Sequence, residues 1–273
     1  MLRTLLIILC FAPLVLQGKT VKADKKKLGQ VEAVQFDYVQ SPYVVKEEWD
    51  QVCPHFLPFN HPLKAKLDKI FGSSRVIANS QTLAAAGFTD PYPRQWSKTI
   101  VTTHPLLKGY YFKMYTDDQT DKCDYIQWQK RIAGANAIQE LINTYGSQRY
   151  FKVPKKWIYP LPAEPSPPIG SPRKNFILIA EDMGCNHGDK NRACWRKISK
   201  ERLNALYWVV QTLGLRDSQP FNIPFCEDGK QAFVDTEHHH SWPVPYQKML
   251  RHIPSKMQSH FWNAINVETR GKI

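Results

Sequence analysis

The stretch Leu213–Glu237 reads LGLRDSQPFNIPFCEDGKQAFVDTE and places Asn222 between two carboxylates, Asp217 and Asp235. Two short apolar runs follow Asn222, and the tetrapeptide Glu-Asp-Gly-Lys separates them. An Asp-Gly pair between apolar runs is a strong hairpin signal, and the hairpin would return Asp235 to the neighbourhood of Asn222. An oxygen-rich corner of this kind suits a hard divalent cation such as Mg²⁺. Taken alone, however, the spacing favours an ordinary surface hairpin over a metal site, so the choice between the two depends on the rest of the chain.

The composition indicates a folded protein with a basic surface. The chain has 273 residues, of which 42% are hydrophobic and 12% aromatic, enough for a substantial core and too apolar for a disordered protein. The formal net charge of +13 favours anionic partners such as phosphates, nucleic acid or acidic membrane faces. No nucleic-acid-binding motif accompanies this charge, so we expect no nucleic-acid partner.

The N-terminus has the pattern of a secretory signal peptide. Arg3 precedes the apolar run Leu5–Leu16, which has the length of a signal sequence and is short for a membrane span. We therefore predict a signal peptide over residues 1–18 and a secreted protein, with an uncleaved membrane anchor as the less favoured alternative. No other stretch is long and apolar enough to cross a bilayer, so we expect no transmembrane span in the mature chain.

Cysteine and histidine give weak evidence for cross-links or metal sites. Cys10 falls in the predicted signal peptide, and the other five cysteines are Cys53, Cys123, Cys185, Cys194 and Cys226. Cys185 and Cys194 could close a short loop in an oxidising compartment, but sequence does not define connectivity, and an odd number leaves one thiol unpaired. The chain has no Cys-x-x-Cys pair, which argues against structural zinc. The run His238–His240 favours a loop over a metal site, because consecutive side chains diverge.

Strand signals occupy the middle of the chain. Thr99–Thr103 and Gly109–Tyr115 are rich in β-branched and aromatic residues and flank a proline-containing turn, so we expect them to pair. The second carries Lys113 among aromatic residues, either as a charge that protects a sheet edge or as a functional cation. Phe151–Tyr159 predicts another strand, and the unbroken apolar run Asn175–Ala180 is typical of a buried strand.

Helix signals occur before, between and after these strands. Apolar residues recur at helical spacing in Asn60–Phe71, Asp124–Tyr145 and Ser199–Leu213, and we expect Asn60 and Ser199 to cap the first and last. Glu140 lies near the end of the second helix, a position where an isolated glutamate is normally solvated. This order of strands and helices predicts an α+β fold whose two parts join at residues 181–184.

The order of these elements and the polar residues among them resemble the protein-kinase fold. In that family a catalytic loop H-R-D-x-x-x-x-N precedes a hairpin and the motif D-F-G. Here Leu215–Asn222 (LRDSQPFN) contains the Arg, Asp and Asn. Asp235–Glu237 (DTE) stands where D-F-G would, thirteen residues after Asn222 (235 − 222), a separation typical of the family.

The resemblance extends to the nucleotide-binding residues of the family. Lys113 looks like the lysine of the V-A-I-K strand, and Glu140 has a plausible position for its ion-pair partner on the next helix. Ala180–Met183 looks like the hinge, where backbone groups of Glu181 and Met183 would meet adenine.

These positions imply a set of roles in phosphoryl transfer. Lys113 would hold the α- and β-phosphates of ATP, and Glu140 would orient that lysine. Asn222 and Asp235 would ligate Mg²⁺, with Mn²⁺ as an alternative. Asp217 would accept the proton of the attacking hydroxyl.

The chain departs from the family pattern at several positions. The only candidate for a glycine-rich loop, Asn79–Phe88, carries one glycine. Leu215 replaces the catalytic-loop histidine, and Thr236 and Glu237 replace the Phe and Gly of D-F-G. Only 38 residues follow Asp235 (273 − 235), too few for a complete C-terminal lobe. The expected fold is therefore an α+β, protein-kinase-like bilobal fold with a truncated C-lobe.

The resemblance divides the chain into four parts and implies a function. We expect a signal peptide at 1–18, an N-terminal extension at 19–78, a kinase-like N-lobe at 79–180 and a reduced C-lobe at 181–273. The leading expectation is a secreted phosphotransferase that moves the γ-phosphoryl group of ATP to an unidentified hydroxyl acceptor, which could be a protein. A catalytically dead pseudokinase that acts as a binding module is the alternative. A third possibility is an unrelated α+β protein whose basic surface binds acidic ligands.

Overall fold

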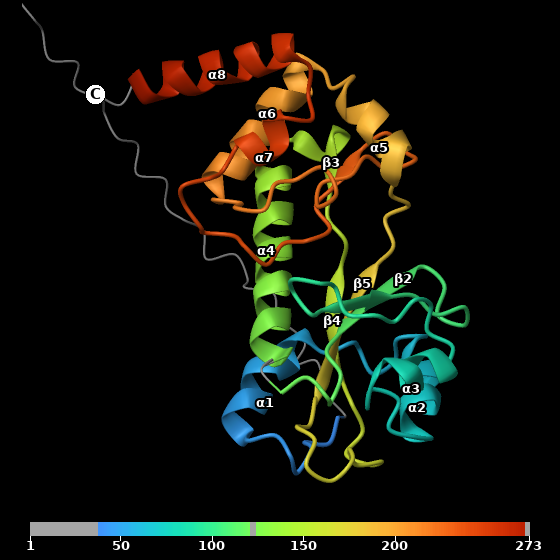
Figure 1. Ribbon diagram of the computed structural model, residues 1–273. Helices are drawn as coiled ribbons and strands as arrows, with labels where there is room; N and C mark the ends of the chain where they lie inside the picture. Colours follow the sequence, from blue (N-terminus) through green and yellow to red (C-terminus); the bar gives the residue numbers. More distant parts are fainter. Residues whose placement is uncertain (1–37, 121–123, 271–273) are drawn as a thin grey trace, which may run out of the picture. The chain divides into compact units, whose positions relative to one another are not determined.

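The computed structural model describes residues 38–120 and 124–270, with backbone alone for 264–270. The predicted signal peptide, residues 19–37 of the expected extension, and Cys123 lie outside the described residues. Within those described, the chain is α+β and belongs to one compact unit (Figure 1). None of the helices in this part of the chain is long and apolar enough to cross a membrane.

A four-stranded antiparallel sheet forms the centre of the part of the chain that precedes α5 (Gly188–Trp195). Its strand order is β1 (Ile100–Thr102), β2 (Tyr110–Met114), β5 (Phe176–Glu181) and β4 (Lys156–Pro160). The expected pairing of the first two strands is confirmed, and Val101 lies opposite Lys113. β5 is central, hydrogen-bonded to β2 on one side and β4 on the other, which accounts for its unbroken apolar sequence.

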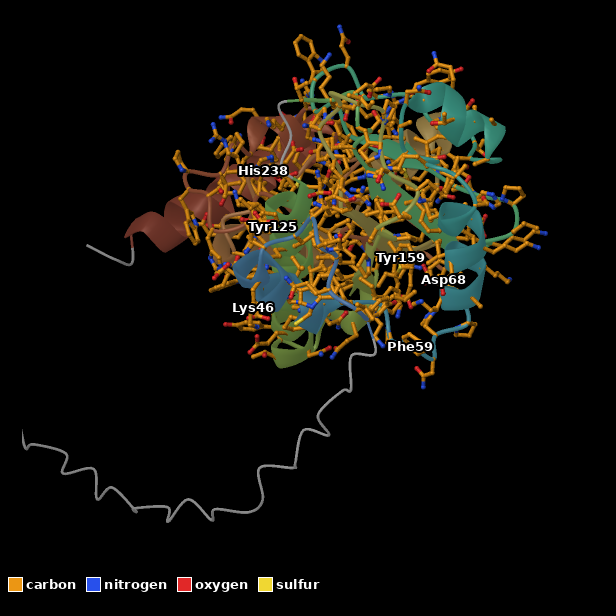
Figure 2. All side chains as sticks on the ribbon, turned by 90° about the horizontal axis from the view of Figure 1, so that it is seen from below. Lys46, Phe59, Asp68, Tyr125, Tyr159 and His238 are labelled. Atoms are coloured by element: carbon orange, nitrogen blue, oxygen red, sulfur yellow. The ribbon has the colours of Figure 1, made fainter. Side chains whose placement is uncertain are left out.

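The two faces of the sheet pack against different helices. On one face, Ile177 and Ile179 of β5 pack with residues of α2 (Lys64–Gly72) and α3 (Ser80–Ala85). Tyr159 of β4 donates a hydrogen bond of 2.8 Å to the carboxylate of Asp68 on α2 and ties that helix to the sheet (Figure 2).

On the other face, Phe176 and Leu178 of β5 pack with residues of α1 (Lys46–Val52) and of α4 (Asp124–Thr144). Leu178 lies opposite Lys113, and successive side chains of a strand alternate between faces. Lys113 therefore shares the face that α4 covers.

The helix α4 belongs to two hydrophobic clusters at once. Ile132 packs with the sheet residues, whereas Ile138 and Ile142 pack with the helices of the C-terminal half. The helix ends as predicted, because Gly146 adopts a left-handed φ of 62°. Figure 1 shows α4 running along its length from α1 to the region of α6.

The C-terminal half is mainly helical. It contains α5 (Gly188–Trp195), α6 (Lys200–Thr212), α7 (Gln247–Leu250) and α8 (Ser255–Arg270). The hydroxyl of Ser199 accepts a hydrogen bond from the amide of Arg202, which confirms the expected cap of α6. A two-stranded parallel sheet joins β3 (Phe151–Lys152) to β6 (Gln231–Ala232).

Three expected local features differ in the structure. The strand predicted over Phe151–Tyr159 is divided into β3 and β4, and Pro154, which cannot donate to a sheet, lies in the break. Asn60 does not cap the first predicted helix, because α2 begins at Lys64 with no side-chain cap. The glycine-loop candidate is instead the helix α3, whose cap residue Asn79 exchanges hydrogen bonds with Thr82.

Residues 38–78, the described part of the expected N-terminal extension, contribute to the core. Trp49 packs in the cluster with α4, and Leu67 and Phe71 pack in the cluster on the opposite sheet face. Two short 3₁₀ helices, η1 (Cys53–His55) and η2 (Ser147–Arg149), complete the regular structure of the described ranges. The proline-rich run between β4 and β5 is irregular, as predicted, and Ile169 within it is fully exposed.

Candidate functional site

A tight chain reversal brings the two halves of Leu213–Glu237 together. The amide of Cys226 donates to the carbonyl of Lys230 over 2.7 Å, and Phe225 pairs with Gln231 in an antiparallel bridge. The amide of Val234 donates to the carbonyl of Asn222 over 3.0 Å. The predicted return of the chain to Asn222 is confirmed, although its second strand is reduced to the two residues of β6.

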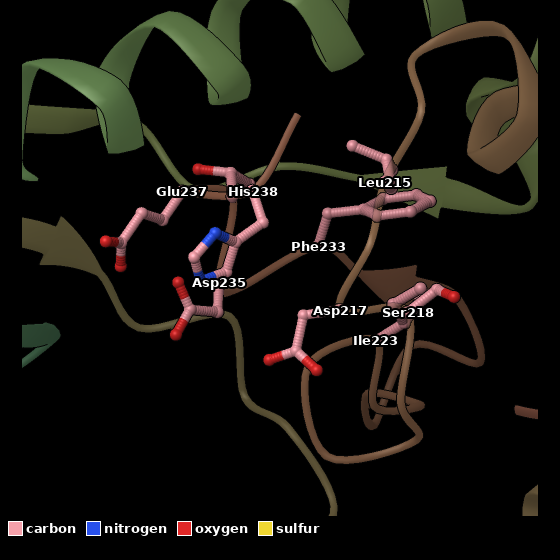
Figure 3. A pocket seen from close by; sticks show the side chains of 9 residues that line it. Leu215, Asp217, Ser218, Ile223, Phe233, Asp235, Glu237 and His238 are labelled. Carbon is pink, nitrogen blue, oxygen red and sulfur yellow. The ribbon is translucent and has the colours of Figure 1, made fainter. Parts of the chain in front are cut away.

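Asp217 is held by hydrogen bonds from three side chains. Asn222 donates its amide nitrogen to the Asp217 carboxylate over 2.7 Å and to the Asp217 carbonyl over 3.0 Å. Gln219 donates to the other carboxylate oxygen over 2.6 Å, and Lys248 of α7 lies 3.4 Å from that oxygen. These contacts restrict the rotamer of Asp217 and leave its carboxylate in the pocket shown in Figure 3.

Lys113 and Asp235 meet as the sequence predicted. The Lys113 Nζ lies 3.6 Å from a carboxylate oxygen of Asp235, and the Lys113 side chain is only 10% exposed. Burial lowers the pKa of Lys113 to about 8, although the Asp235 carboxylate acts in the opposite direction. Lys113 therefore retains its charge at neutral pH because an anion lies beside it.

Arg131 on α4 also pairs with this acidic segment, and the sequence interpretation missed it. Its guanidinium forms ion pairs with both Asp235 and Glu237, and its side chain is only 4% exposed. Gly134, on the same side of the helix, permits the approach: a Cβ there would lie 2.0 Å from the Thr236 carbonyl oxygen. An arginine three positions before a glycine inside a helix is the signal that could have indicated this contact.

Lys156 brings a third buried cation to the same place. It donates to the Thr236 hydroxyl over 2.6 Å, and that hydroxyl donates to the carbonyl of Arg131. Burial lowers the pKa of Lys156 well below its usual value, and the neighbouring Lys113 charge lowers it further. Thr236 thus connects β4 to α4.

The carboxylate of Asp235 remains ionised within this cation cluster, which we define as Lys113, Arg131 and Lys156. Burial favours the protonated acid, but the three cations outweigh burial and hold the pKa of Asp235 below its usual range. Lys113 and Arg131 pair with the two carboxylates of Asp235 and Glu237, and Lys156 beside them adds a positive charge when it is protonated, a state that a further anion would favour.

Glu140 is not brought to Lys113. It is exposed on α4, nine residues after Arg131 (140 − 131), a helical rise of about 14 Å. Arg131 lies on the face of α4 that meets the sheet and the segment after β6, whereas Glu140 lies beyond that contact. The residue of α4 that lies beside Lys113 and Asp235 is therefore the cation Arg131 and not Glu140.

Of the two expected hinge residues, Glu181 ends β5 and Met183 follows it, and backbone groups of both already have partners. The amide of Glu181 donates to the Lys155 carbonyl over 3.0 Å. The carbonyl of Met183 accepts a hydrogen bond of 2.9 Å from the Lys152 side chain. These contacts fix the path of the connection between the sheet and the helical half.

A small pocket connects Asp217 to Asp235 (Figure 3). Its lining residues come from two segments of the chain, and they are Leu215, Asp217, Ser218, Ile223, Phe233, Asp235, Thr236, Glu237 and His238. The proposed base and one proposed metal ligand thus share one concave surface. Lys113, Asn222 and Arg131 reach these residues through the contacts given above.

The oxygen donors of the site are carboxylate and amide oxygens, which are the ligands that a hard cation such as Mg²⁺ prefers. Asn222 commits its amide nitrogen to Asp217, so its amide oxygen is the atom that would meet a metal. Asp235 would supply a carboxylate, which Arg131 and Lys113 now share. In the described residues, no three His, Cys, Asp or Glu side chains are grouped to hold a metal. The run His238–His240 is held by its backbone to the end of α6.

No protein-family model matches the chain, and no curated protein matches it significantly in sequence.

Proposed function

We propose that the chain is a kinase-like phosphotransferase that binds ATP with Mg²⁺ or Mn²⁺ between Lys113 and the Asp217–Asn222 loop. The observation that carries the proposal is the meeting of Lys113 and Asp235, 122 residues apart (235 − 113), at 3.6 Å. Separate elements of the fold supply these residues, so local sequence pattern does not explain their contact. The bilobal kinase-like arrangement with a reduced C-lobe is part of this proposal.

The charges of the cluster support phosphate binding. Lys113 and Arg131 balance the neighbouring carboxylates, and a nucleotide phosphate would supply the negative charge that keeps the buried Lys156 protonated. Asn222 and Asp235 would hold the metal, which when bound neutralises charge on the phosphates. Exclusion of water by the surrounding apolar residues would strengthen each of these interactions.

The orientation of Asp217 supports its role as the base. The hydroxyl oxygen of the acceptor attacks the γ-phosphorus, the bond to the bridging oxygen breaks, and ADP leaves. The hydroxyl proton passes to the Asp217 carboxylate, which Asn222 and Gln219 hold in one rotamer. Pre-positioning of this kind reduces the entropy lost on reaching the transition state.

A binding module without turnover is the second candidate, and the contacts of Arg131 favour it. Arg131 and Lys113 already neutralise Asp235, so a metal must compete with two cations for this carboxylate. A protein that uses the site only to hold a nucleotide or a partner would keep this pairing.

Export of the protein is also proposed, supported by the signal-like pattern of residues 1–18.

The test measures binding and transfer separately. ATP with Mg²⁺ at a hundred times its dissociation constant should stabilise the wild type by about 2.7 kcal/mol. Asp217→Asn should retain this stabilisation and lose transfer of labelled γ-phosphate, to a generic hydroxyl acceptor or water, by about 100-fold or more. Asp235→Asn should lose both, and Asp189→Asn, whose side chain is 95% exposed on α5, should lose neither.

The outcomes separate the two candidates. Stabilisation of the wild type without any transfer would select the binding module. Absence of stabilisation, at metal and nucleotide concentrations that saturate ordinary kinases, would reject the phosphotransferase and any module that holds a nucleotide, and would leave only a module that holds a partner. The unfolding midpoint of each variant, measured first without nucleotide, identifies any variant that has lost its fold.

A further inference from the structure

Two cysteines that are 41 positions apart (226 − 185) lie side by side next to the candidate site. The Sγ atoms of Cys185 and Cys226 are 3.3 Å apart. Cys185 follows the expected hinge residues, and Cys226 begins the tight reversal between Asn222 and Asp235. Both residues are at least partly shielded from solvent.

The backbone around the two cysteines has the geometry that a disulfide needs. The residues face each other in an antiparallel bridge. Asn186 donates its amide to the Phe225 carbonyl over 2.7 Å, and Glu227 donates to the Gly184 carbonyl over 3.0 Å. Hydrogen bonds on both flanks define the cysteines as a non-hydrogen-bonded pair, for which the Cα separation is about 4.5 Å. That separation falls inside the range of about 4.4–6.8 Å found for disulfides.

We propose that Cys185 and Cys226 form a disulfide bond in the mature protein. Each thiol loses one proton and one electron, the S–S bond forms, and a low-molecular-weight disulfide such as oxidised glutathione takes up the two electrons and two protons and is reduced to two thiols. The hydrogen bond from Cys185 lowers the pKa of Cys226, and the Lys152 ammonium lowers it further. The thiolate is the attacking species in such an exchange.

The structure selects this pair over the other pairing considered from sequence. Cys194 lies on α5, where its sulfur is 4.0 Å from the side-chain Nδ2 of Asn186, whereas Cys226 is directly opposite Cys185. A disulfide to Cys226 would close a loop that contains α5, α6 and the Asp217–Asn222 segment. The bond would attach the chain reversal at Cys226, which leads to Asp235, to the segment that follows β5. This role does not depend on whether the site transfers phosphate.

Peptide mapping of the full chain tests the proposal. The protein, equilibrated in a glutathione redox buffer, is alkylated and digested with trypsin without reduction. We expect residues 175–190 to be linked to residues 217–230, at the summed mass of both peptides less two hydrogens. Residues 193–196, which carry Cys194, should appear alkylated. A link between 175–190 and 193–196, or recovery of both cysteines of the proposed pair as alkylated thiols, would overturn the proposal.

Thermal unfolding provides a second readout with a matched control. A reductant should lower the unfolding midpoint of the wild type and of Cys194→Ala by about 5–10 °C. Cys226→Ala should already have the lower midpoint and should not respond to reductant. An equal response in both variants would contradict the proposed pairing. If Cys226→Ala does not fold, the peptide map of the wild type decides alone.

Discussion

Arg131 neutralises two carboxylates in a region from which water is largely excluded. Its side chain is 4% exposed, and Asp235 and Glu237 are its partners. An exposed arginine contributes little through an ion pair, but the loss of one member of a buried pair leaves a charge without compensation. The location of Arg131 therefore makes its charge a determinant of both stability and site chemistry.

Replacement of Arg131 by methionine should destabilise the fold by about 3–5 kcal/mol, because two carboxylates would remain partly buried with less positive charge beside them. Urea denaturation measures the change. Arg192→Met is the matched control, since Arg192 pairs with Asp189 on the exposed side of α5 and its replacement should cost no more than about 1 kcal/mol. Equal losses in the two variants would show that the Arg131 pairs contribute nothing specific.

Lys113 should give the protein a distinct pH dependence. Its pKa is about 8 in the folded state and 10.5 as a free side chain, so the unfolded chain binds more protons between these values. The stability contribution of this group is therefore lowest below pH 8 and rises toward pH 10.5, by up to about 3 kcal/mol. The wild type should gain stability relative to Lys113→Met as pH rises from 7 to 10. A constant difference in the free energy of unfolding would contradict the assigned burial.

At the scale of single residues, the sequence predicted positions within short motifs better than positions on separate elements. Asp217 and Asn222 lie within one loop, and the Asp-Gly hairpin signal correctly predicted the chain reversal that brings Asp235 near them. Arg131 and Lys156 reach the site through the face of a helix and the register of a strand, which spacing along the chain does not reveal. Glu140 satisfied the expected order of residues but not the geometry of the helix.

The helix α4 depends on a glycine at its closest contact. Alanine normally stabilises a helix interior by about 1 kcal/mol relative to glycine. At Gly134 the added Cβ would lie 2.0 Å from the Thr236 carbonyl oxygen, a backbone atom that cannot move alone. The helix and the segment Asp235–Glu237 would have to separate.

Gly134→Ala should therefore lower the free energy of unfolding by about 1–3 kcal/mol and weaken stabilisation by nucleotide. Chemical denaturation with and without ATP and Mg²⁺ provides both values. Gly72→Ala at the end of α2 is the control, because no heavy atom lies within 4 Å of its new Cβ. A gain in stability for both variants would show that α4 does not contact this segment as described.

Among the elements, long periodic segments were predicted well and interrupted ones were not. The helices α4 and α6 and the strands β1, β2 and β5 follow their apolar patterns to within a residue or two. The run 151–159 looked continuous, but its two ends belong to different sheets, a long-range pairing that composition cannot show. The segment 79–88, the only candidate for a glycine-rich loop, contains a helix because Asn79 and Thr82 supply a capping box.

At the scale of the whole molecule, α4 couples the sheet to the helical half. Ile132 and Ile138 are buried in different clusters on one continuous helix. Unfolding of either cluster would expose part of α4 and remove support from the other. We therefore expect the described residues to unfold as one cooperative unit rather than as independent lobes.

Ile138→Ala should test this coupling. The side chain is fully buried, so its truncation should cost about 2–5 kcal/mol. Far-ultraviolet circular dichroism and tryptophan fluorescence, followed during urea unfolding, should shift to the same lower midpoint. Two separate midpoints, one of them unchanged from the wild type, would show that the clusters unfold independently.

The alternation of side chains in β2 and β4 has a consequence for how this protein tolerates changes in length. Lys113 and Lys156 point toward α4 because each has the correct phase within its strand. A single-residue insertion that shifts the register of either strand would turn the shifted side chains, the lysine included, to the opposite face of the sheet. The irregular run between β4 and β5 has no such phase and can accept added residues. Diverged relatives of this chain should therefore vary in length in that run, while the strands keep their length even where most of their residues differ.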